Sequence, residues 1–163
     1  MSEPQKFFGK YRGKVSDNKD PRKRGRLKVT APDVLGDQES RWAVPCVPYA
    51  GKGVGWFLIP PVNASVWIEF EQGDLDCPIW SGCFWSDDEV PVSDAAPEKK
   101  VLKTDCGTIT INDQQGSAGI TIETKSGMKV VMDDQGIELS NGSQKIKLAT
   151  ANVSINDGAL EVM

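Results

Sequence analysis

The last sixty or so residues carry short apolar pairs with a spacing of two, separated by Gly, Asn and Asp. A period of two is typical of a half-buried β-strand, because successive side chains point to opposite faces. Each predicted strand is about four to six residues long, as is usual in globular proteins. The pairs are Ile109/Ile111, Ile120/Ile122, Val130/Met132, Ile137/Leu139, Ile146/Leu148, Val153/Ile155 and Leu160/Val162.

This region contains no helix-period segment and no second apolar layer that could cover these pairs. One copy therefore cannot close a core here, whereas several copies around a common axis could. Half of an ordinary monomeric sandwich is the alternative, but the short strands and regular pairs favour an assembly of copies. We predict that its core holds Ile109, Ile111, Ile120, Ile122, Val130, Met132, Ile137, Leu139, Ile146, Leu148, Val153 and Ile155.

The N-terminal half also predicts strands joined by turns, so the whole chain is expected to be all-β. Five or more short strands within about 80 residues suit a small barrel. Residues 1–10 are expected to be an extension, 11–85 the barrel, 86–100 a polar linker and 101–163 the strand-repeat region. The expected barrel strands are Tyr11–Val15, Gly25–Thr30, Trp42–Pro48, Trp56–Ile59, Ser65–Phe70 and Pro78–Phe84, with a loop at Gly51–Gly55.

The composition is ordinary for a soluble protein, with 39% apolar and 26% charged residues among 163. No apolar run approaches the roughly 18 residues needed to span a membrane. The first eight residues lack the apolar core of a signal peptide, so Sec-dependent export is not expected. The four cysteines form no CxxC pair, and their apolar neighbours predict reduced, mostly buried thiols in a protein made in the cytoplasm.

Candidate catalytic chemistry is sparse. The chain has no histidine, which excludes Ser/His and Cys/His nucleophiles. The carboxylates at Asp87-Asp88-Glu89 and Asp133-Asp134 lie in a predicted linker and a predicted turn, without the cleft that acid/base pairs need. Cysteine spacings fit no usual zinc pattern, and no Walker loop occurs. We therefore expect no enzyme activity, no cofactor and no metal site.

An ordered series of motifs from about residue 11 to 148 resembles the central spike proteins of contractile phage baseplates and the VgrG spikes of type VI secretion. No single motif is diagnostic, but the order is fairly specific. The motifs are Gly13-Lys14-Val15, Asp20-Pro21, Gly25-Arg26-Leu27-Lys28-Val29, Pro32, Trp42-Ala43, Pro48-Tyr49-Ala50-Gly51, Gly55-Trp56-Phe57-Leu58-Ile59-Pro60, Val66-Trp67-Ile68-Glu69-Phe70, Gly73-Asp74-Leu75-Asp76-Cys77-Pro78-Ile79, Gly82 and Thr104-Asp105-Cys106-Gly107-Thr108-Ile109-Thr110-Ile111-Asn112-Asp113.

The resemblance implies an oligosaccharide/oligonucleotide-binding (OB) barrel followed by an intertwined triple-stranded β-helix, assembled as a homotrimer. It implies a structural spike at the tip of a contractile injection machine, which pierces the target envelope and touches its membrane transiently. A tail-tube or baseplate hub protein would bind at the barrel end. A PAAR-like tip protein would dock on Leu160, Val162 and Met163, because the chain stops in the apolar alternation and has no histidine for the iron-binding apex of some relatives. A frayed C-terminus is the alternative.

The charge distribution leaves one alternative open. The first 30 residues hold ten Lys or Arg and three Asp or Glu, whereas the remainder holds nine and twenty. An OB module binding single-stranded nucleic acid or glycan would combine such cations with aromatic platforms. We favour a solvated barrel turn at Arg22–Arg26, with the aromatics in the core and in trimer contacts, and expect no nucleic acid. These aromatics are Trp42, Tyr49, Trp56, Phe57 and Trp67.

Overall fold

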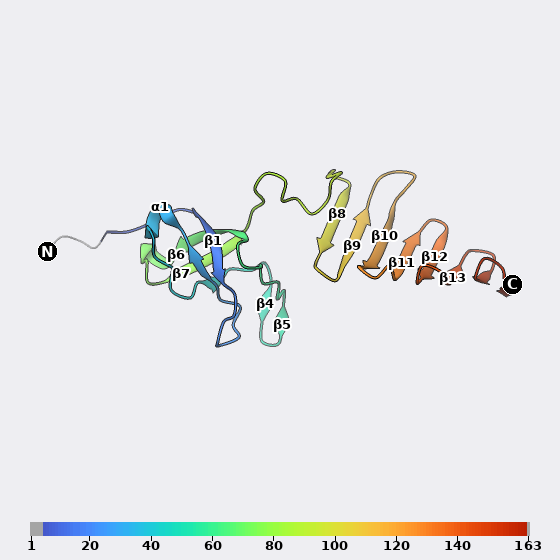
Figure 1. The fold of residues 1–163 in the computed structure, drawn as a ribbon, viewed down its shortest axis with the longest axis horizontal. Coiled ribbons are helices and arrows are strands. Elements are labelled where there is room, and N and C mark those ends of the chain that lie inside the picture. Colours follow the sequence, from blue (N-terminus) through green and yellow to red (C-terminus); the bar gives the residue numbers. More distant parts are fainter. Residues whose placement is uncertain (1–4, 163) are drawn as a thin grey trace. The chain divides into compact units, whose positions relative to one another are not determined.

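The computed structural model describes residues 5–162, which are all-β apart from two single-turn helices. The chain divides between Glu89 and Val90 into two compact units (Figure 1). None of the helices in the described part is long and apolar enough to cross a membrane. The expected all-β class is confirmed, and each unit is built on its own sheet.

The first unit is a five-stranded sheet in the order β2-β1-β6-β7-β3. Its central strands are antiparallel, while β3 and β7 pair in parallel. The strand predicted at Ser65–Phe70 has those bounds in the structure, and four of its six side chains are buried. The bounds are β1 Tyr11–Asp17, β2 Lys28–Thr30, β3 Val44–Pro45, β6 Ser65–Phe70 and β7 Pro78–Cys83.

The segment before β3 closes this sheet into a barrel. Leu27 and Ala43 exchange both backbone hydrogen bonds, with N···O distances of 3.1 and 2.7 Å. The Ser40 N–H donates to the Val29 carbonyl at 2.8 Å, so the same segment also lies along β2. Because β3 then pairs with β7, both edges of the sheet are covered, as an OB barrel requires.

The barrel encloses the core. Leu27, Val29, Val66 and Ile68 are fully buried, because each occupies an inward position of its strand or of the closing segment. Trp80 on β7 is also buried, and its indole N–H donates to the Gly25 carbonyl at 3.0 Å. This hydrogen bond satisfies the indole N–H, which is the one polar group of the buried Trp80 side chain.

A helix, a hairpin and a 3-10 turn lie between the barrel strands. The helix α1 Pro32–Leu35 and the hairpin of β4 Ala50–Gly51 and β5 Val54–Gly55 were not expected. This hairpin replaces the predicted loop, and Trp56–Ile59 forms no strand. The 3-10 turn η1 spans Glu71–Gly73.

The prediction of mostly buried thiols is wrong. Cys46, Cys77, Cys83 and Cys106 are all free and exposed. On β7 the inward positions belong to Pro78 and Trp80, so the alternation of the strand places Cys83 on the outside. Apolar neighbours in sequence did not indicate burial because every second strand residue faces away from the core.

The second unit is a single sheet of eight strands in chain order, β8 to β15 (Figure 1). Every neighbouring pair of strands is antiparallel, so the unit is a simple meander. The sheet begins at Lys99, inside the segment predicted as linker. The bounds are β8 Lys99–Lys103, β9 Gly107–Asn112, β10 Gly119–Thr124, β11 Lys129–Asp133, β12 Gly136–Ser140, β13 Lys145–Leu148, β14 Val153–Ile155 and β15 Leu160–Val162.

Candidate assembly interface

The strand register of the second unit aligns the apolar pairs into two continuous ladders on one face of the sheet. Ile120 on β10, for example, lies opposite Ile111 on one side and Met132 on the other. The first ladder contains Ile111, Ile120, Met132, Ile137, Leu148, Val153 and Val162. The second contains Leu102, Ile109, Ile122, Val130, Leu139, Ile146, Ile155 and Leu160.

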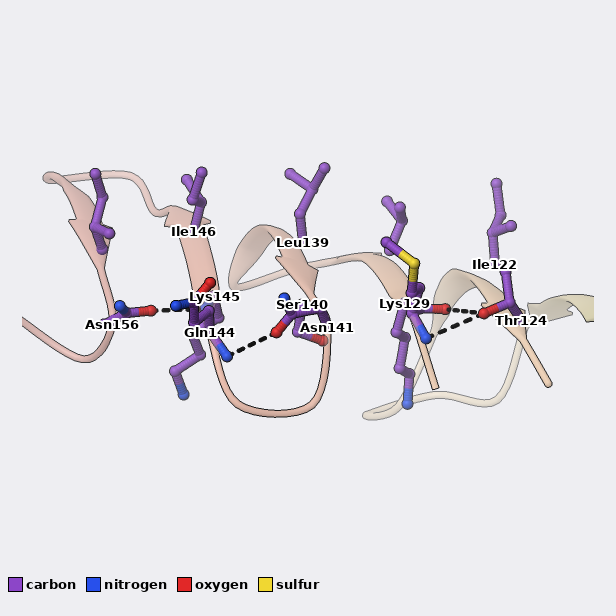
Figure 2. A pocket seen from close by; sticks show the side chains of 13 residues that line it. Ile122, Thr124, Lys129, Leu139, Ser140, Asn141, Gln144, Lys145, Ile146 and Asn156 are labelled. Carbon is purple, nitrogen blue, oxygen red and sulfur yellow. Dashed lines mark hydrogen bonds between the residues drawn. The ribbon is translucent and has the colours of Figure 1, made fainter. Parts of the chain in front are cut away.

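These ladders, which we call the aliphatic face, are open to solvent in the single chain. No residue from Val90 to Val162 is buried. Nine of the twelve predicted core residues are exposed, from 36% for Ile120 to 46% for Leu139, and Val130, Met132 and Ile155 are half-buried. Figure 2 shows Ile122 on β10, Leu139 on β12 and Ile146 on β13 extending in the same direction. An apolar surface of this extent marks a place where another protein surface binds.

The opposite face is polar. Thr121 lies between Thr110 and Val131, and Glu138 lies opposite Lys147. Since charged and hydroxyl side chains occupy this face, it can stay in water. The sheet therefore has one face for water and one for an apolar partner, which is the arrangement of an antiparallel sheet with half of its core missing.

Short polar turns hold the strands in register along one side of the aliphatic face. The Asn141 side-chain oxygen accepts the Gln144 N–H at 2.9 Å, and the Asn156 side-chain oxygen accepts the Lys145 N–H at 2.9 Å (Figure 2). Lys145 also pairs with Asp157, and this hydrogen bond raises the pKa of the Lys145 ammonium. Asn141, Gln144, Lys145 and Asn156, together with apolar side chains of the aliphatic face, line a hollow of about 500 Å³ over β10 to β14.

A close backbone contact requires glycine at the start of β12. A Cβ atom on Gly136 would lie 2.0 Å from the Leu148 carbonyl oxygen, and the residue has a φ of 131°. No L side chain fits there without moving β13 away from β12. The glycine thus fixes the close approach that keeps Ile137 level with Leu148.

The predicted docking residues for a tip protein lie on the last strand. Leu160 and Val162 are 55% and 58% exposed, and each continues one of the two ladders. Met163 lies outside the described residues. The first strand of the sheet differs, because its edge carries Lys99, Lys100 and Lys103.

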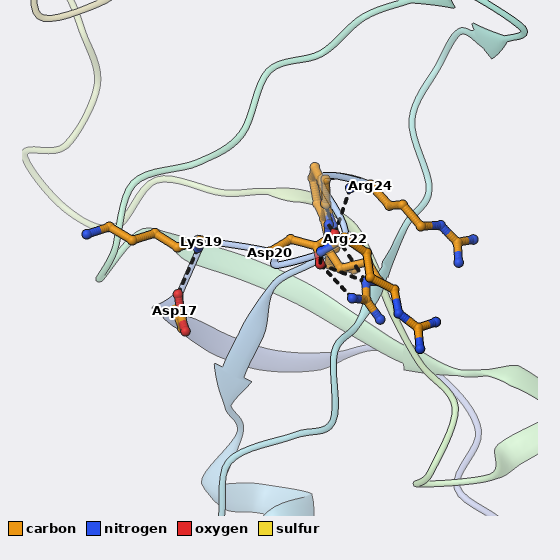
Figure 3. A network of polar contacts seen from close by, with 8 residues as sticks. Asp17, Lys19, Asp20, Arg22 and Arg24 are labelled. Carbon is orange, nitrogen blue, oxygen red and sulfur yellow. Dashed lines mark hydrogen bonds and ion pairs between the residues drawn. The ribbon is translucent and has the colours of Figure 1, made fainter.

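The basic cluster of the barrel is organised around Asp20. The Asp20 carboxylate accepts the N–H groups of Arg22 at 2.9 Å and Arg24 at 2.7 Å, and it pairs with the Arg26 guanidinium at 2.5 Å (Figure 3). The Arg26 bond holds the pKa of the Asp20 carboxyl well below its ordinary value. Sequence reasoning missed this role, although Asp before Pro is a common turn-forming pair.

The aromatic residues of the barrel fall into two groups. Trp42 and Trp67 are half-buried and stack on cations of the same chain, with Arg26 5.5 Å and Arg12 5.2 Å from the ring centroids. Tyr49 just before the β4–β5 hairpin, and Trp56 and Phe57 just after it, are more than half exposed. None of the five therefore lies in the buried core of the single barrel, and their place in trimer contacts stays a prediction.

Carboxylates and thiols do not gather in this structure. Among the described residues, no three Cys, Asp or Glu side chains lie close enough together to hold a metal ion. Asp87, Asp88 and Glu89 are exposed, as are Asp133 and Asp134.

The sequence matches two known families in chain order. Residues 11–85 match the type VI secretion system/phage-baseplate injector OB domain. Residues 99–161 match the phage baseplate V C-terminal trimerisation domain. The first match covers the barrel, and the second covers the sheet that carries the aliphatic face.

Among individual proteins, the chain is similar to the type VI secretion system spike protein VgrG4b of Pseudomonas aeruginosa. The two are 39% identical over 49 residues. This stretch is 30% of the chain and 6% of the relative, so the chain corresponds to a small part of that protein.

Proposed function

The chain belongs to the VgrG-like family of baseplate spike proteins, and from that premise we propose that three copies form the central spike of a contractile injection machine. The family is one of structural baseplate components of phages and injection particles. We propose that this member acts mechanically, by piercing the envelope of the target cell and touching its membrane transiently. It would be assembled in the bacterial cytoplasm and would have no enzyme activity.

The aliphatic face carries this proposal. It runs along every strand of the second unit, and none of the described residues of that unit is buried. Three such sheets would cover one another around a threefold axis, with the predicted core residues inside and the polar faces outside. Eight strands at a spacing of about 4.8 Å give a prism on the order of 35 Å long.

This construction suits a part that works under load. The hydrogen bonds between strands are made within each chain, whereas the apolar contacts would be made between chains. Removing one sheet would expose its whole aliphatic face, and the faces of both neighbours, in one step. Apolar burial is roughly proportional to area, so the prism would resist loss of any single chain.

The two ends of the prism would have different partners. Lysines on the edge of β8 discourage pairing with another strand, as charged edge residues do in many sheets. The edge of β15 instead presents Leu160 and Val162, with Glu161 between them on the other face. We propose that a PAAR-like tip protein docks on this end, with Met163 as a third contact, and that the barrels bind the tail-tube or hub protein.

Locating the protein in particles tests this function. Contractile particles would be purified from cells that produce the chain with an N-terminal epitope, and gold-labelled antibody would be located by electron microscopy. We expect label at the baseplate end, and particles from a gene deletion should no longer permeabilise target cells until the wild-type gene is restored. Unlabelled particles, or a deletion that leaves permeabilisation unchanged, would contradict the proposal.

A further inference from the structure

The barrel carries an apolar hollow that the assembly of the prism leaves unused. It has a volume of about 330 Å³ and lies between the β4–β5 hairpin and the barrel wall. Gly25 forms part of its floor, since a Cβ atom there would lie 3.1 Å from Ile59 and 3.4 Å from Phe57. We call it the hairpin groove; its lining includes Arg24, Gly25, Tyr49, Trp56, Phe57 and Trp80.

One rim of the hairpin groove is positively charged. Arg22, Lys23 and Arg24 are exposed and make no ion pair within the described residues, whereas the neighbouring Arg26 is neutralised by Asp20. The backbone of this turn is fixed by the bonds from Arg22 and Arg24 to the Asp20 carboxylate. Figure 3 shows the Arg24 side chain extending away from that carboxylate. The cations are therefore held in place and available to an acidic partner.

The C-terminal end of the same unit carries an acidic segment that complements the basic rim. Trp85 is 65% exposed and is followed two residues later by Asp87, Asp88 and Glu89. Glu89 closes a turn by accepting the Ser86 N–H at 2.7 Å. Within the chain, no ion pair of the described residues joins this acidic segment to the basic rim.

We propose that Trp85–Glu89 of one copy docks on the hairpin groove of the next copy, so that the barrels of the trimer form a closed ring. In a cyclic trimer each interface joins two different patches, and each chain must therefore carry both halves. This barrel carries both halves: one is the hairpin groove, which is aromatic and has a basic rim, and the other is the exposed Trp85 beside three carboxylates. Tryptophan is a preferred anchor at interfaces, and opposite charges around it set the register.

A nucleic acid fits the groove less well. Binding of a single strand needs cations that follow the backbone over several nucleotides and aromatic rings arranged in series. Here three cations, Arg22 to Arg24, share one turn and a fourth, Lys52, lies on the β4–β5 hairpin, and of these four Arg24 alone lines the groove. Trp42 and Trp67 are already stacked against cations of the same chain.

Zero-length carbodiimide cross-linking of the full-length trimer tests this docking. The reagent joins Lys23 to a carboxylate only where the two are in contact, and mixed trimers of isotope-labelled and unlabelled chains distinguish links between copies from links within one. We expect Lys23 to be linked to Asp87, Asp88 or Glu89 of another copy. The Arg22→Glu/Arg24→Glu variant should lower the yield at least tenfold while keeping both backbone bonds to Asp20.

A charge swap makes the test independent of folding defects. Adding Asp87→Lys/Asp88→Lys to Arg22→Glu/Arg24→Glu should restore links between copies, now in the opposite sense. Asp33→Lys/Asp37→Lys changes the charge of the barrel by the same amount and in the same direction as Asp87→Lys/Asp88→Lys, at exposed positions, and should leave the Lys23 link intact. The inference rests on three copies being joined through the aliphatic face. Light scattering measures the trimer independently of the cross-links, so loss of the trimer is distinguished from loss of the docking contact.

Three results would overturn the inference. The first is an intact trimer in which Lys23 is not linked to these carboxylates, or is linked only within one chain. The second is a swapped variant that stays unlinked. The third is an Arg22→Glu/Arg24→Glu variant that keeps the links from Lys23 but no longer binds an oligonucleotide or a tail-tube protein. That molecule, and not Trp85–Glu89 of another copy, would then occupy the hairpin groove.

Discussion

A charge placed in the middle of the aliphatic face should disrupt the trimer. Ile122 lies on β10 between Ile109 and Val130, and the residue is 42% exposed in the single chain. Ile122→Asp removes that apolar contact and would place three carboxylates at one level of the proposed axis. Thr121→Asp is the matched control, because the adjacent residue points to the polar face, opposite Thr110 and Val131.

The magnitude follows from the exposed fraction. Complete burial of an isoleucine contributes about 1.5–3 kcal/mol, and 42% of that is about 0.6–1.3 kcal/mol per chain, or about 2–4 kcal/mol per trimer. The desolvation of each carboxylate costs several kcal/mol more. The total is on the order of 10 kcal/mol per trimer, so the variant should dissociate at micromolar concentration.

Light scattering and thermal unfolding of the full chain measure this effect. We expect the Ile122→Asp variant to be monomeric at neutral pH and the Thr121→Asp variant to remain trimeric, with a melting temperature within a few degrees of the wild type. An Ile122→Asp trimer that melts like the wild type would refute the assignment of the core. Equal damage by both variants would also refute it, because the effect would then not depend on the face.

The pH dependence of the Ile122→Asp variant has a defined sign. Burial in the trimer raises the pKa of the introduced carboxyl above its unfolded value, so the penalty is present above that value and fades as the carboxyl becomes protonated. The trimer should therefore recover relative to the wild type as the pH falls toward about 4. A variant that is equally dissociated at pH 7 and pH 4 would indicate a steric cause.

Three further predictions concern other parts of the chain. The pKa of Asp20 is lowered in the folded barrel, so the stability that its carboxylate contributes is present above the ordinary carboxyl pKa and is lost as the pH falls below it. Asp20→Asn should therefore lower the melting temperature at pH 7 and make the melting temperature depend less on pH in the acid range. An unchanged acid profile of the melting temperature would contradict this. Gly136→Ala should destabilise the sheet by at least about 3 kcal/mol, because the added methyl group meets the Leu148 carbonyl. Gly142→Ala has open space around the Cβ position and should cost only about 1–2 kcal/mol for its positive φ. Thermal unfolding of both variants measures the difference, and equal losses of stability would count against the close contact at Gly136. Deletion of residues 159–163 should leave the trimer intact and abolish capture of a PAAR-like tip protein in a pull-down assay, and retained capture would rule out this docking site.

The strands of the repeat region were predicted well because their pattern has a single interpretation as secondary structure. Pairs with a spacing of two, separated by Gly, Asn or Asp, allow only short strands and tight turns, and the register places the predicted residues on one face. The first strand was missed because Lys99, Lys100 and Lys103 make it polar. An edge strand needs few apolar residues, so hydropathy alone does not reveal it.

The barrel was less predictable in its irregular parts. Ser65–Phe70 is a central strand with a clear apolar pattern, whereas the hairpin around Gly53 is short and exposed. The apolar residues after it suggested a core strand, but Trp56 and Phe57 line a surface groove instead. Composition distinguishes an apolar residue from a polar one; it does not distinguish a core position from an interface.

The candidate site depends on contacts between copies. The sequence of one copy indicates such contacts only through apolar residues that its own fold leaves exposed. The aliphatic face was predictable because its residues repeat. The pairing of the basic rim with the acidic segment was not, because only the structure shows that Asp20 pairs with the Arg26 side chain but contacts Arg22 and Arg24 through their backbone N–H groups. The burial of the predicted core residues in a trimer stays a prediction.

Native mass spectrometry of the full-length protein tests the central claim most directly. The account predicts one dominant species with three times the 17.7 kDa mass of the chain, which persists at high salt because its core is apolar. A monomer at micromolar concentration would contradict the account, since the aliphatic face would then remain exposed to water.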